Sequence, residues 1–308
     1  MTAVAEPTVP PRRRTRRLPS VEAMAGYGLA APAFLLIVVI LLAPAAGVFV
    51  IALSDWQFGA TTLNVVGFDN FQALFRDAVF QKSFVNTLAY TAVVVPATVG
   101  LGLIVALLIH SAPSLSGFYR TAHFLPVMAT LAAMAIAWEA LLHPTIGLIN
   151  QILDALALPT ANWLRDEGTV LMTLAVIGVW QNFGLAMVLF IAGLTAIPTE
   201  LYDAADVDGA DGWFERHRLV TLPMLGPVTM FVVIVIALRA FEVFDTVAIL
   251  TQGGPQNASQ VMLYTLYVES FEFLRTGYGA AVTVVFLVIV VSLTLLQARV
   301  MDRRVHYT

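Results

Sequence analysis

The chain has 308 residues, of which 59% are hydrophobic and 12% are charged. Soluble domains carry about 25% charged residues, so a soluble fold of this length would lack the polar surface that keeps it in solution. The net charge of −4 offers no broad basic surface, and we expect no nucleic-acid partner. The absence of cysteine excludes disulfides, a thiolate nucleophile and cysteine-ligated metal centres. The composition favours a protein embedded in a lipid bilayer.

Six apolar stretches are long enough to cross a bilayer as helices, which takes roughly 20 residues each. They cover residues 27–53, 86–110, 123–142, 169–196, 223–249 and 278–298. The third is the weakest, because Glu139 lies near its end and His143-Pro144 closes it. The sequence therefore predicts an all-α, polytopic membrane protein with six transmembrane helices in one membrane domain, residues 27–298.

Orientation follows from the Lys and Arg residues that flank the spans, which accumulate on the cytoplasmic side. A cytoplasmic N-terminus places eleven Arg residues inside the cell and only four basic residues outside it. Both termini are therefore predicted to be cytoplasmic, with a basic tail at residues 1–26 and a second tail at residues 299–308.

The N-terminus also permits a different interpretation. Arg-rich residues 12–17, the following apolar run and Ala43-Pro44-Ala45 resemble a cleavable secretory or twin-arginine signal. The apolar run is longer than the 7–15 residues of a signal peptide, and five more spans follow it. These features favour an uncleaved first span.

Two outer segments, residues 54–85 and 143–168, contain short helical patterns. In the first, Phe68, Phe71, Leu74 and Phe75 recur with helical spacing. Such a helix either packs under its own loop or receives a partner, because amphipathic spacing indicates burial and not its purpose.

The inner loop between spans four and five, residues 197–223, predicts a short helix, a turn and a second short helix. Pro198 and Thr199 supply a helix start, and Glu200 and Asp203 complement the positive helix N-terminus. Gly209 permits a sharp change of direction. The segment either docks in a groove of another protein or is a solvated loop whose acidic residues cluster.

Segment 203–223 resembles the EAA motif of permease subunits in binding-protein-dependent ABC importers. Five further stretches are similar to the carbohydrate-uptake branch of that family: 67–71, 124–126, 239–245, 250–255 and 277–281. The leading Glu of the motif is Asp203 here, and the segment before Leu222 is one residue longer than the commonest form. By resemblance, loop 198–223 couples the permease to an ATPase through Asp203, Ala204, Ala205, Asp208, Gly209, Ala210, Leu222 and Pro223.

The resemblance also implies the location and the partners of the chain. It implies a bacterial inner membrane, a second homologous permease subunit, two ATP-binding subunits and an extracytoplasmic solute-binding protein. The chain has no G-x-x-x-x-G-K-[ST] motif, so we expect it to be no enzyme, with ATP and Mg²⁺ bound by the separate ATPase. Its five histidines are scattered, and no catalytic or zinc motif accompanies them. We expect no catalytic residue, metal or cofactor on this chain.

Four charged residues fall inside the predicted spans, where a charge costs about 2.5–3.5 kcal/mol on insertion scales. They are Glu139, Arg239, Glu242 and Asp245. Two interpretations remain open: Arg239 and Glu242 form a structural ion pair, or the cluster lines a solute path in which Phe241 and Phe244 stack on sugar rings.

The sequence therefore predicts half of the translocation path of an ATP-driven importer for a sugar, oligosaccharide or polyol. An importer of glycerol 3-phosphate is the alternative within the same architecture, although a phosphate favours more Arg than Arg239 alone. A self-sufficient ion-coupled carrier is the alternative from a different class, because it would use intramembrane carboxylates. It would not explain loop 198–223.

Overall fold

The computed structural model describes residues 21–111, 116–210 and 212–304. These residues are mostly helical, and among them the only β-type pairing is an isolated bridge between Ser54 and Val65. The predicted all-α class is confirmed. The Arg-rich part of the N-terminal tail and the last four residues of the C-terminal tail lie outside the described residues.

The chain divides into two compact units between Val48 and Phe49. The first contains α1 (Val21–Leu36), the π-helical turn η1 (Ile37–Leu42) and most of α2 (Ala43–Ala52). Together these elements make an apolar helix over Ala25–Ala52, which corresponds to the first predicted span.

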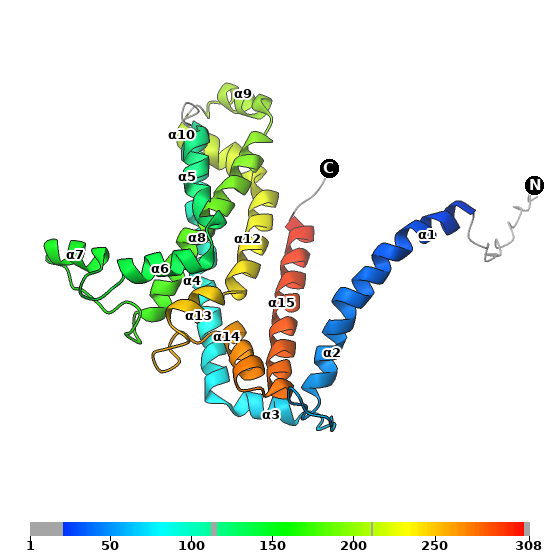
Figure 1. The fold of residues 1–308 in the computed structure, drawn as a ribbon. Helices are drawn as coiled ribbons and strands as arrows, with labels where there is room; N and C mark the ends of the chain where they lie inside the picture. Colours follow the sequence, from blue (N-terminus) through cyan, green and yellow to red (C-terminus); the bar gives the residue numbers. More distant parts are fainter. Residues whose placement is uncertain (1–20, 112–115, 211, 305–308) are drawn as a thin grey trace, which may run out of the picture. The chain divides into compact units, whose positions relative to one another are not determined.

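The second unit holds the remaining helices, which Figure 1 shows in chain order. Their bounds are α3 Asp69–Arg76, α4 Ala78–Ser111, α5 Ser116–Met128, α6 Leu131–Leu141, α7 Leu148–Ala155, α8 Val170–Thr195, α9 Thr199–Val207, α10 Trp213–Arg216, η3 His217–Thr221, α11 Leu222–Met224, α12 Gly226–Phe241, α13 Asp245–Leu250, α14 Met262–Tyr267, η4 Val268–Glu272 and α15 Thr276–Arg304.

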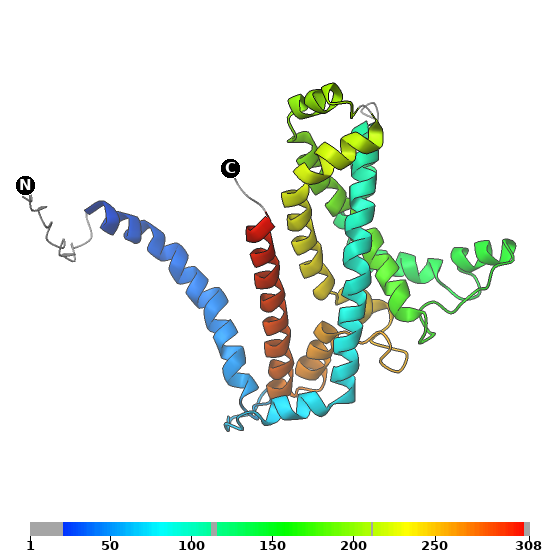
Figure 2. The ribbon, with the colours of Figure 1, turned by 180° about the vertical axis from the view of Figure 1, so that it is seen from behind.

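Helices α4 and α8 form the centre of this unit, with α12 packed on both of them. They approach closely because a glycine faces a small residue: a Cβ added at Gly102 would lie 2.6 Å from the Ala186 Cβ. Small residues at such contacts are the usual basis of helix packing in membranes, where lipid removes the hydrophobic driving force. Loop α9–α10 lies at one end of the unit, and α3 lies at the other end (Figures 1 and 2).

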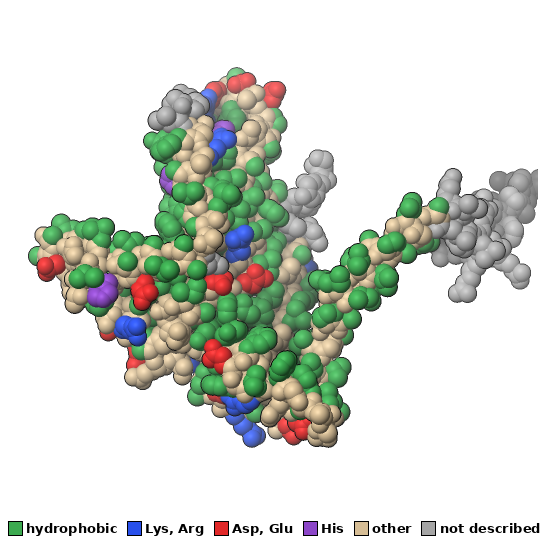
Figure 3. All heavy atoms as spheres, in the orientation of Figure 1, with side chains coloured by type: hydrophobic (Ala, Val, Ile, Leu, Met, Phe, Trp, Pro, Cys, Tyr) green, Lys and Arg blue, Asp and Glu red, His purple; other side chains and the backbone are tan. Residues whose placement is uncertain are grey.

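Five helical segments in the described part of the chain are long and apolar enough to cross a membrane. In the second unit they are Ala78–Ser111, Val170–Thr195, Gly226–Leu250 and Thr276–Arg299. Apolar side chains cover most of the long helices on the face that Figure 3 shows. These segments correspond to predicted spans two, four, five and six.

The third predicted span, 123–142, is not one continuous helix. It comprises α5 and α6, which meet at a bend of 100°. Thr130 has extended backbone angles there, and α6 has only 11 residues, which rise about 16 Å and cannot cross a 30 Å core alone. The described part of the chain therefore has six candidate spans only if the bent pair counts as one.

At the end of the second unit opposite loop α9–α10, the buried carboxylate of Glu269 is paired with one cation, Arg275. Glu269 is 5% exposed, and its carboxylate pairs with the Arg275 guanidinium at 2.6 Å. Arg275 also lies 5.4 Å from the ring centres of both Phe273 and Tyr278. Burial raises the pKa of Glu269 above its ordinary value, and Arg275 opposes that rise.

Replacing Gly102 with Ala should loosen the contact between α4 and α8. The new Cβ would overlap the Ala186 Cβ, and overpacking of this kind typically costs about 1–3 kcal/mol. Thermal unfolding in detergent should show a lower midpoint for Gly102→Ala. Gly100→Ala in the same helix is the matched control, because its added Cβ meets no atom within 4 Å. Equal midpoints for the two variants would contradict this packing.

Arg275→Gln should destabilise the protein in a pH-dependent way. Burial disfavours the charged form of Glu269, and without the Arg275 cation its pKa rises further above the ordinary value, so the cost of the unpaired carboxylate grows as the pH rises. The loss in melting temperature should therefore be larger at pH 8 than at pH 5. Arg76→Gln, which alters an exposed Arg of α3, serves as the control. An equal loss at both pH values would show that Arg275 acts through packing alone.

Candidate functional site

The fifth predicted span is interrupted within the membrane. Helix α12 ends at Phe241, and α13 begins at Asp245 after three residues that are not helical. The 16 residues of α12 rise about 24 Å, so the interruption lies inside a hydrocarbon core of roughly 30 Å. Backbone that leaves the helical pattern at this depth is tolerated only where protein or a water-filled cavity surrounds it.

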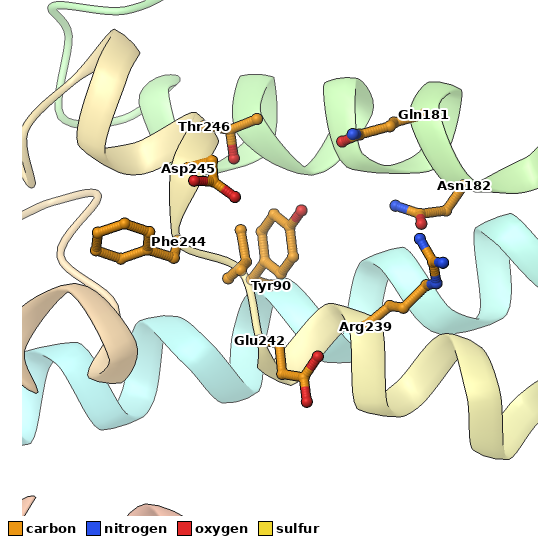
Figure 4. A pocket seen from close by; sticks show the side chains of 9 residues that line it. Tyr90, Gln181, Asn182, Arg239, Glu242, Phe244, Asp245 and Thr246 are labelled. Carbon is orange, nitrogen blue, oxygen red and sulfur yellow. The ribbon is translucent and has the colours of Figure 1, made fainter. Parts of the chain in front are cut away.

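A cavity of about 370 Å³ lies beside this interruption. Four helices contribute to its walls: α4, α8, α12 and α13 (Figure 4). The lining residues are Tyr90, Gln181, Asn182, Arg239, Glu242, Val243, Phe244, Asp245 and Thr246. We call this the central cavity.

Several polar groups of the central cavity have no partner within the described chain. The side chains of Gln181, Arg239, Glu242 and Asp245 make no hydrogen bond or ion pair with any described residue, whereas the Asn182 amide donates to the Gly178 carbonyl at 2.8 Å. A charge at membrane depth must meet water, a solute or another protein. The central cavity is therefore built to receive polar groups that this chain does not supply.

The ion-pair interpretation of Arg239 and Glu242 is wrong. In Figure 4 the Arg239 guanidinium points toward Asn182, while the Glu242 carboxylate points away from it. Glu242 is the C-cap residue of α12, directly after the last helical residue, Phe241. The two side chains therefore do not share one face, although their spacing of three residues permits it in a continuous helix.

Four of the six predicted path residues line the central cavity, and two do not. Phe241 is buried with 4% exposure and does not line the cavity. Glu139 lies on α6 and lines a separate pocket with Arg165 and Gln252. The bend between α5 and α6 accounts for this separation, because it turns α6 by 100°.

Sequence reasoning missed five lining residues: Tyr90, Gln181, Asn182, Val243 and Thr246. One signal was available, since Gln181-Asn182 is an adjacent pair of amides in the middle of an otherwise apolar span. Tyr90 carried no such signal, because an aromatic residue within an apolar helix is ordinary packing.

Loop 198–223 forms the predicted helix, turn and second helix. Helix α9 ends in a Schellman motif: the Ala210 N–H donates to the Ala205 carbonyl at 2.9 Å, and the Gly209 N–H donates to that of Asp206 at 3.1 Å. Gly209 has φ +85°, a left-handed conformation that residues with a side chain rarely adopt. The glycine is therefore needed for the turn.

Two side-chain contacts link α9 to the segment that follows the turn. The Arg216 guanidinium binds both carboxylate oxygens of Asp206, with Nε donating to Oδ1 at 2.7 Å. The Tyr202 hydroxyl lies 3.1 Å from the Thr221 hydroxyl. Sequence reasoning identified neither contact. They give the loop a defined shape, which a solvated loop of clustered acidic residues would not have.

The loop exposes apolar side chains. Val207 is 88% exposed, Phe214 68% and Leu219 61%. Of the eight predicted coupling residues, Ala210 is buried, Ala205 is half-buried, and the other six are exposed. Exposed apolar groups on a folded loop are typical of an interaction surface.

Groups of three or more potential metal ligands are not found among residues 21–111, 116–210 and 212–304. The helical spans, the unpartnered polar groups of the central cavity and the exposed loop together define a subunit of a membrane transport system.

Comparisons identify the transport system. The family model described as "Binding-protein-dependent transport system inner membrane component" matches residues 83–307. The chain is 32% identical over 253 residues to the probable ABC transporter permease protein YurN of Bacillus subtilis, covering 81% of this chain and 86% of YurN. It is 32% identical over 285 residues to the sn-glycerol-3-phosphate transport system permease protein UgpA of Agrobacterium fabrum, covering 91% and 96%.

Two crystal structures of a bacterial alginate ABC transporter contain a chain of the same fold. The first, in complex with an alginate pentasaccharide-bound periplasmic protein, superposes with a TM-score of 0.79 at 20% identity, covering 93% of this chain and 96% of that one. The second superposes with a TM-score of 0.78 at 21% identity, covering 92% and 96%. The chain belongs to the family of binding-protein-dependent transport system inner membrane components. It is a multi-pass inner-membrane permease subunit of an ABC importer.

Proposed function

We propose that this permease carries a neutral, polyhydroxylated solute, a sugar, oligosaccharide or polyol, through the central cavity. The observation that carries the proposal is the set of unpartnered polar side chains beside the interruption of span five. Gln181 and Arg239 offer donors, Glu242 and Asp245 offer acceptors, and Phe244 offers an aromatic face. Hydroxyl groups both donate and accept, so a sugar satisfies this mixed set.

The charge of the cavity favours a neutral solute over an anionic one. Two carboxylates, Glu242 and Asp245, oppose the single guanidinium of Arg239. A phosphate would gain one cation and meet two like charges within the same low-dielectric site. Relatives are named for glycerol 3-phosphate transport, so importing that solute is the alternative within the same architecture, provided that the partner subunit supplies further cations.

A second homologous permease subunit is proposed to complete the central cavity. Arg239, Glu242 and Asp245 are exposed on this chain, although they lie at membrane depth. Charges do not face lipid there, because water or a partner must solvate them. A partner helix bundle across the cavity would leave a polar path between the two subunits.

The remaining partners are proposed to bind at the two ends of the second unit. Loop 198–223 is proposed to dock on one of two cytoplasmic ATP-binding subunits through its exposed apolar groups. In this proposal the ATP-binding subunits bind ATP and Mg²⁺, and this chain binds no cofactor. An extracytoplasmic solute-binding protein would deliver the solute at the opposite end. This arrangement has both termini in the cytoplasm, in agreement with the distribution of Arg.

A self-sufficient ion-coupled carrier would also use unpaired carboxylates in the membrane. Such a carrier mechanism gives no role to loop 198–223, which the contact between Asp206 and Arg216 stabilises and which exposes Val207 and Phe214. Uptake that depends on ATP and on the binding protein separates the two mechanisms.

Substitution of the cavity carboxylates should alter transport and solute preference. We expect Asp245→Asn and Glu242→Gln to reduce uptake in proteoliposomes by roughly tenfold, since a hydrogen bond to a charged group is worth about 1.5–3 kcal/mol. Maltose, trehalose, sucrose and glycerol 3-phosphate, each with its binding protein, form the test panel. Glu167→Gln, an exposed change outside the cavity, is the control. Unaltered rates and preference in assembled complexes would contradict the proposed path.

Gly209→Ala should uncouple ATP hydrolysis from transport while the subunit remains in the membrane. A side chain at φ +85° costs about 1–2 kcal/mol, enough to shift the loop conformation roughly tenfold. Solute-stimulated ATPase activity and co-purification with the ATPase measure the effect. Gly212→Ala is the matched control, because Gly212 has φ −73° and its added Cβ would make only ordinary contacts. Normal coupling in the Gly209 variant would refute the docking role.

A further inference from the structure

A second polar pocket, of about 260 Å³, lies on the outer side of the interruption. Its lining includes Glu139 from α6, Arg165 from the segment after α7, and the chain from Ile249 to Gln252. We call this the outer pocket. Helix α13 separates it from the central cavity: the first residues of α13 line the central cavity, and the last line the outer pocket.

One wall of the outer pocket is held in place by a buried asparagine. Asn86 of α4 is 9% exposed, and its amide donates to the carbonyls of Asn257, Ala258 and Gln260 at 2.9–3.2 Å. Loop 251–260 contains left-handed residues, including Gln252 with φ +49°, that would not persist without such contacts. The wall is therefore a preorganised part of the structure.

The opposite wall has the same construction. Asn150 of α7 is 4% exposed, donates its amide to the carbonyls of Pro144 and Ala161 at 2.9 Å, and accepts from the Trp163 indole N–H at 2.8 Å. This fixes the segment that carries Leu164 and Arg165. Two buried amides thus hold chain segments that adjoin the lining of the outer pocket.

The polar groups of the outer pocket are available for a ligand. Glu139, Arg165 and Gln252 are exposed, and their side chains make no hydrogen bond or ion pair with any described residue. The carboxylate and the guanidinium line the same pocket without pairing, so the pocket has balanced charge. Figure 3 shows acidic and basic side chains close together on the face that carries α6.

We propose that the outer pocket is an entry subsite, in which Glu139, Arg165 and Gln252 bind hydroxyl groups of the solute before it passes α13 to the central cavity. The inference rests on the proposed function of the central cavity. Balanced charge suits a neutral polyhydroxylated molecule, and the six residues of α13 place the two sites about 9 Å apart by helical rise. An oligosaccharide is long enough to touch both sites at once.

The test uses the complete importer in proteoliposomes, with maltose, trehalose and sucrose delivered by binding protein that is titrated up to saturation. Glu139→Gln, Arg165→Gln and Gln252→Ala should each change the ratio of uptake rates between two of these sugars at least threefold. They should leave unchanged the concentration of loaded binding protein that gives half-maximal uptake. Asp154→Asn, an exposed change in α7 outside the outer pocket, is the matched control. Melting temperature and subunit co-purification verify that each variant assembles.

Two results would overturn the inference. Ratios that stay within twofold of wild type would show that the outer pocket does not contact the solute. An equal loss for every sugar, together with a higher half-maximal concentration of binding protein, would show that these residues dock that protein instead. Failure of the proposed function can be distinguished from failure of this inference alone. If the proposed function were wrong, Asp245→Asn would also leave the solute preference unchanged.

Discussion

Backbone N–H and carbonyl groups inside a bilayer have no water to bond, so every departure from a continuous helix must be enclosed by protein or by a polar cavity. The interruption between α12 and α13 is such a departure, and the central cavity beside it satisfies the requirement. The same constraint explains why the charged residues of span five gather there. A cavity that must be polar to accommodate the backbone is also the place where Arg239, Glu242 and Asp245 are tolerated.

The central cavity and loop 198–223 are connected through rigid elements. Helix α8 carries Gln181 and Asn182 at the cavity and leads directly into Pro198 and α9. Helix α12 leaves the same loop after α11 and ends at the cavity with Arg239. Motion of the loop on an ATPase would therefore reach the cavity along two helices. The Asp206 to Arg216 contact and the turn at Gly209 give the loop the defined shape that this proposed coupling requires.

Two buried amides hold the irregular segments near the outer pocket. Asn86 donates to three backbone carbonyls and Asn150 donates to two, all in irregular segments. Irregular loops held in this way present side chains at fixed positions. This is the structural basis for treating the outer pocket as a site, and the orientation of Glu139 toward it follows from the bend before α6.

The sequence by itself determined the all-α membrane class, most of the spans, the turn at Gly209 and the family motif, because hydropathy and backbone conformation are local properties. The loop 198–223 was accessible to the same reasoning. Tertiary structure decided the rest. The bend that splits span three, the interruption of span five and the separation of Glu139 from Asp245 depend on how helices pack around one another. A spacing of three residues permitted a pair between Arg239 and Glu242, but α12 ends between them, and the two side chains point apart.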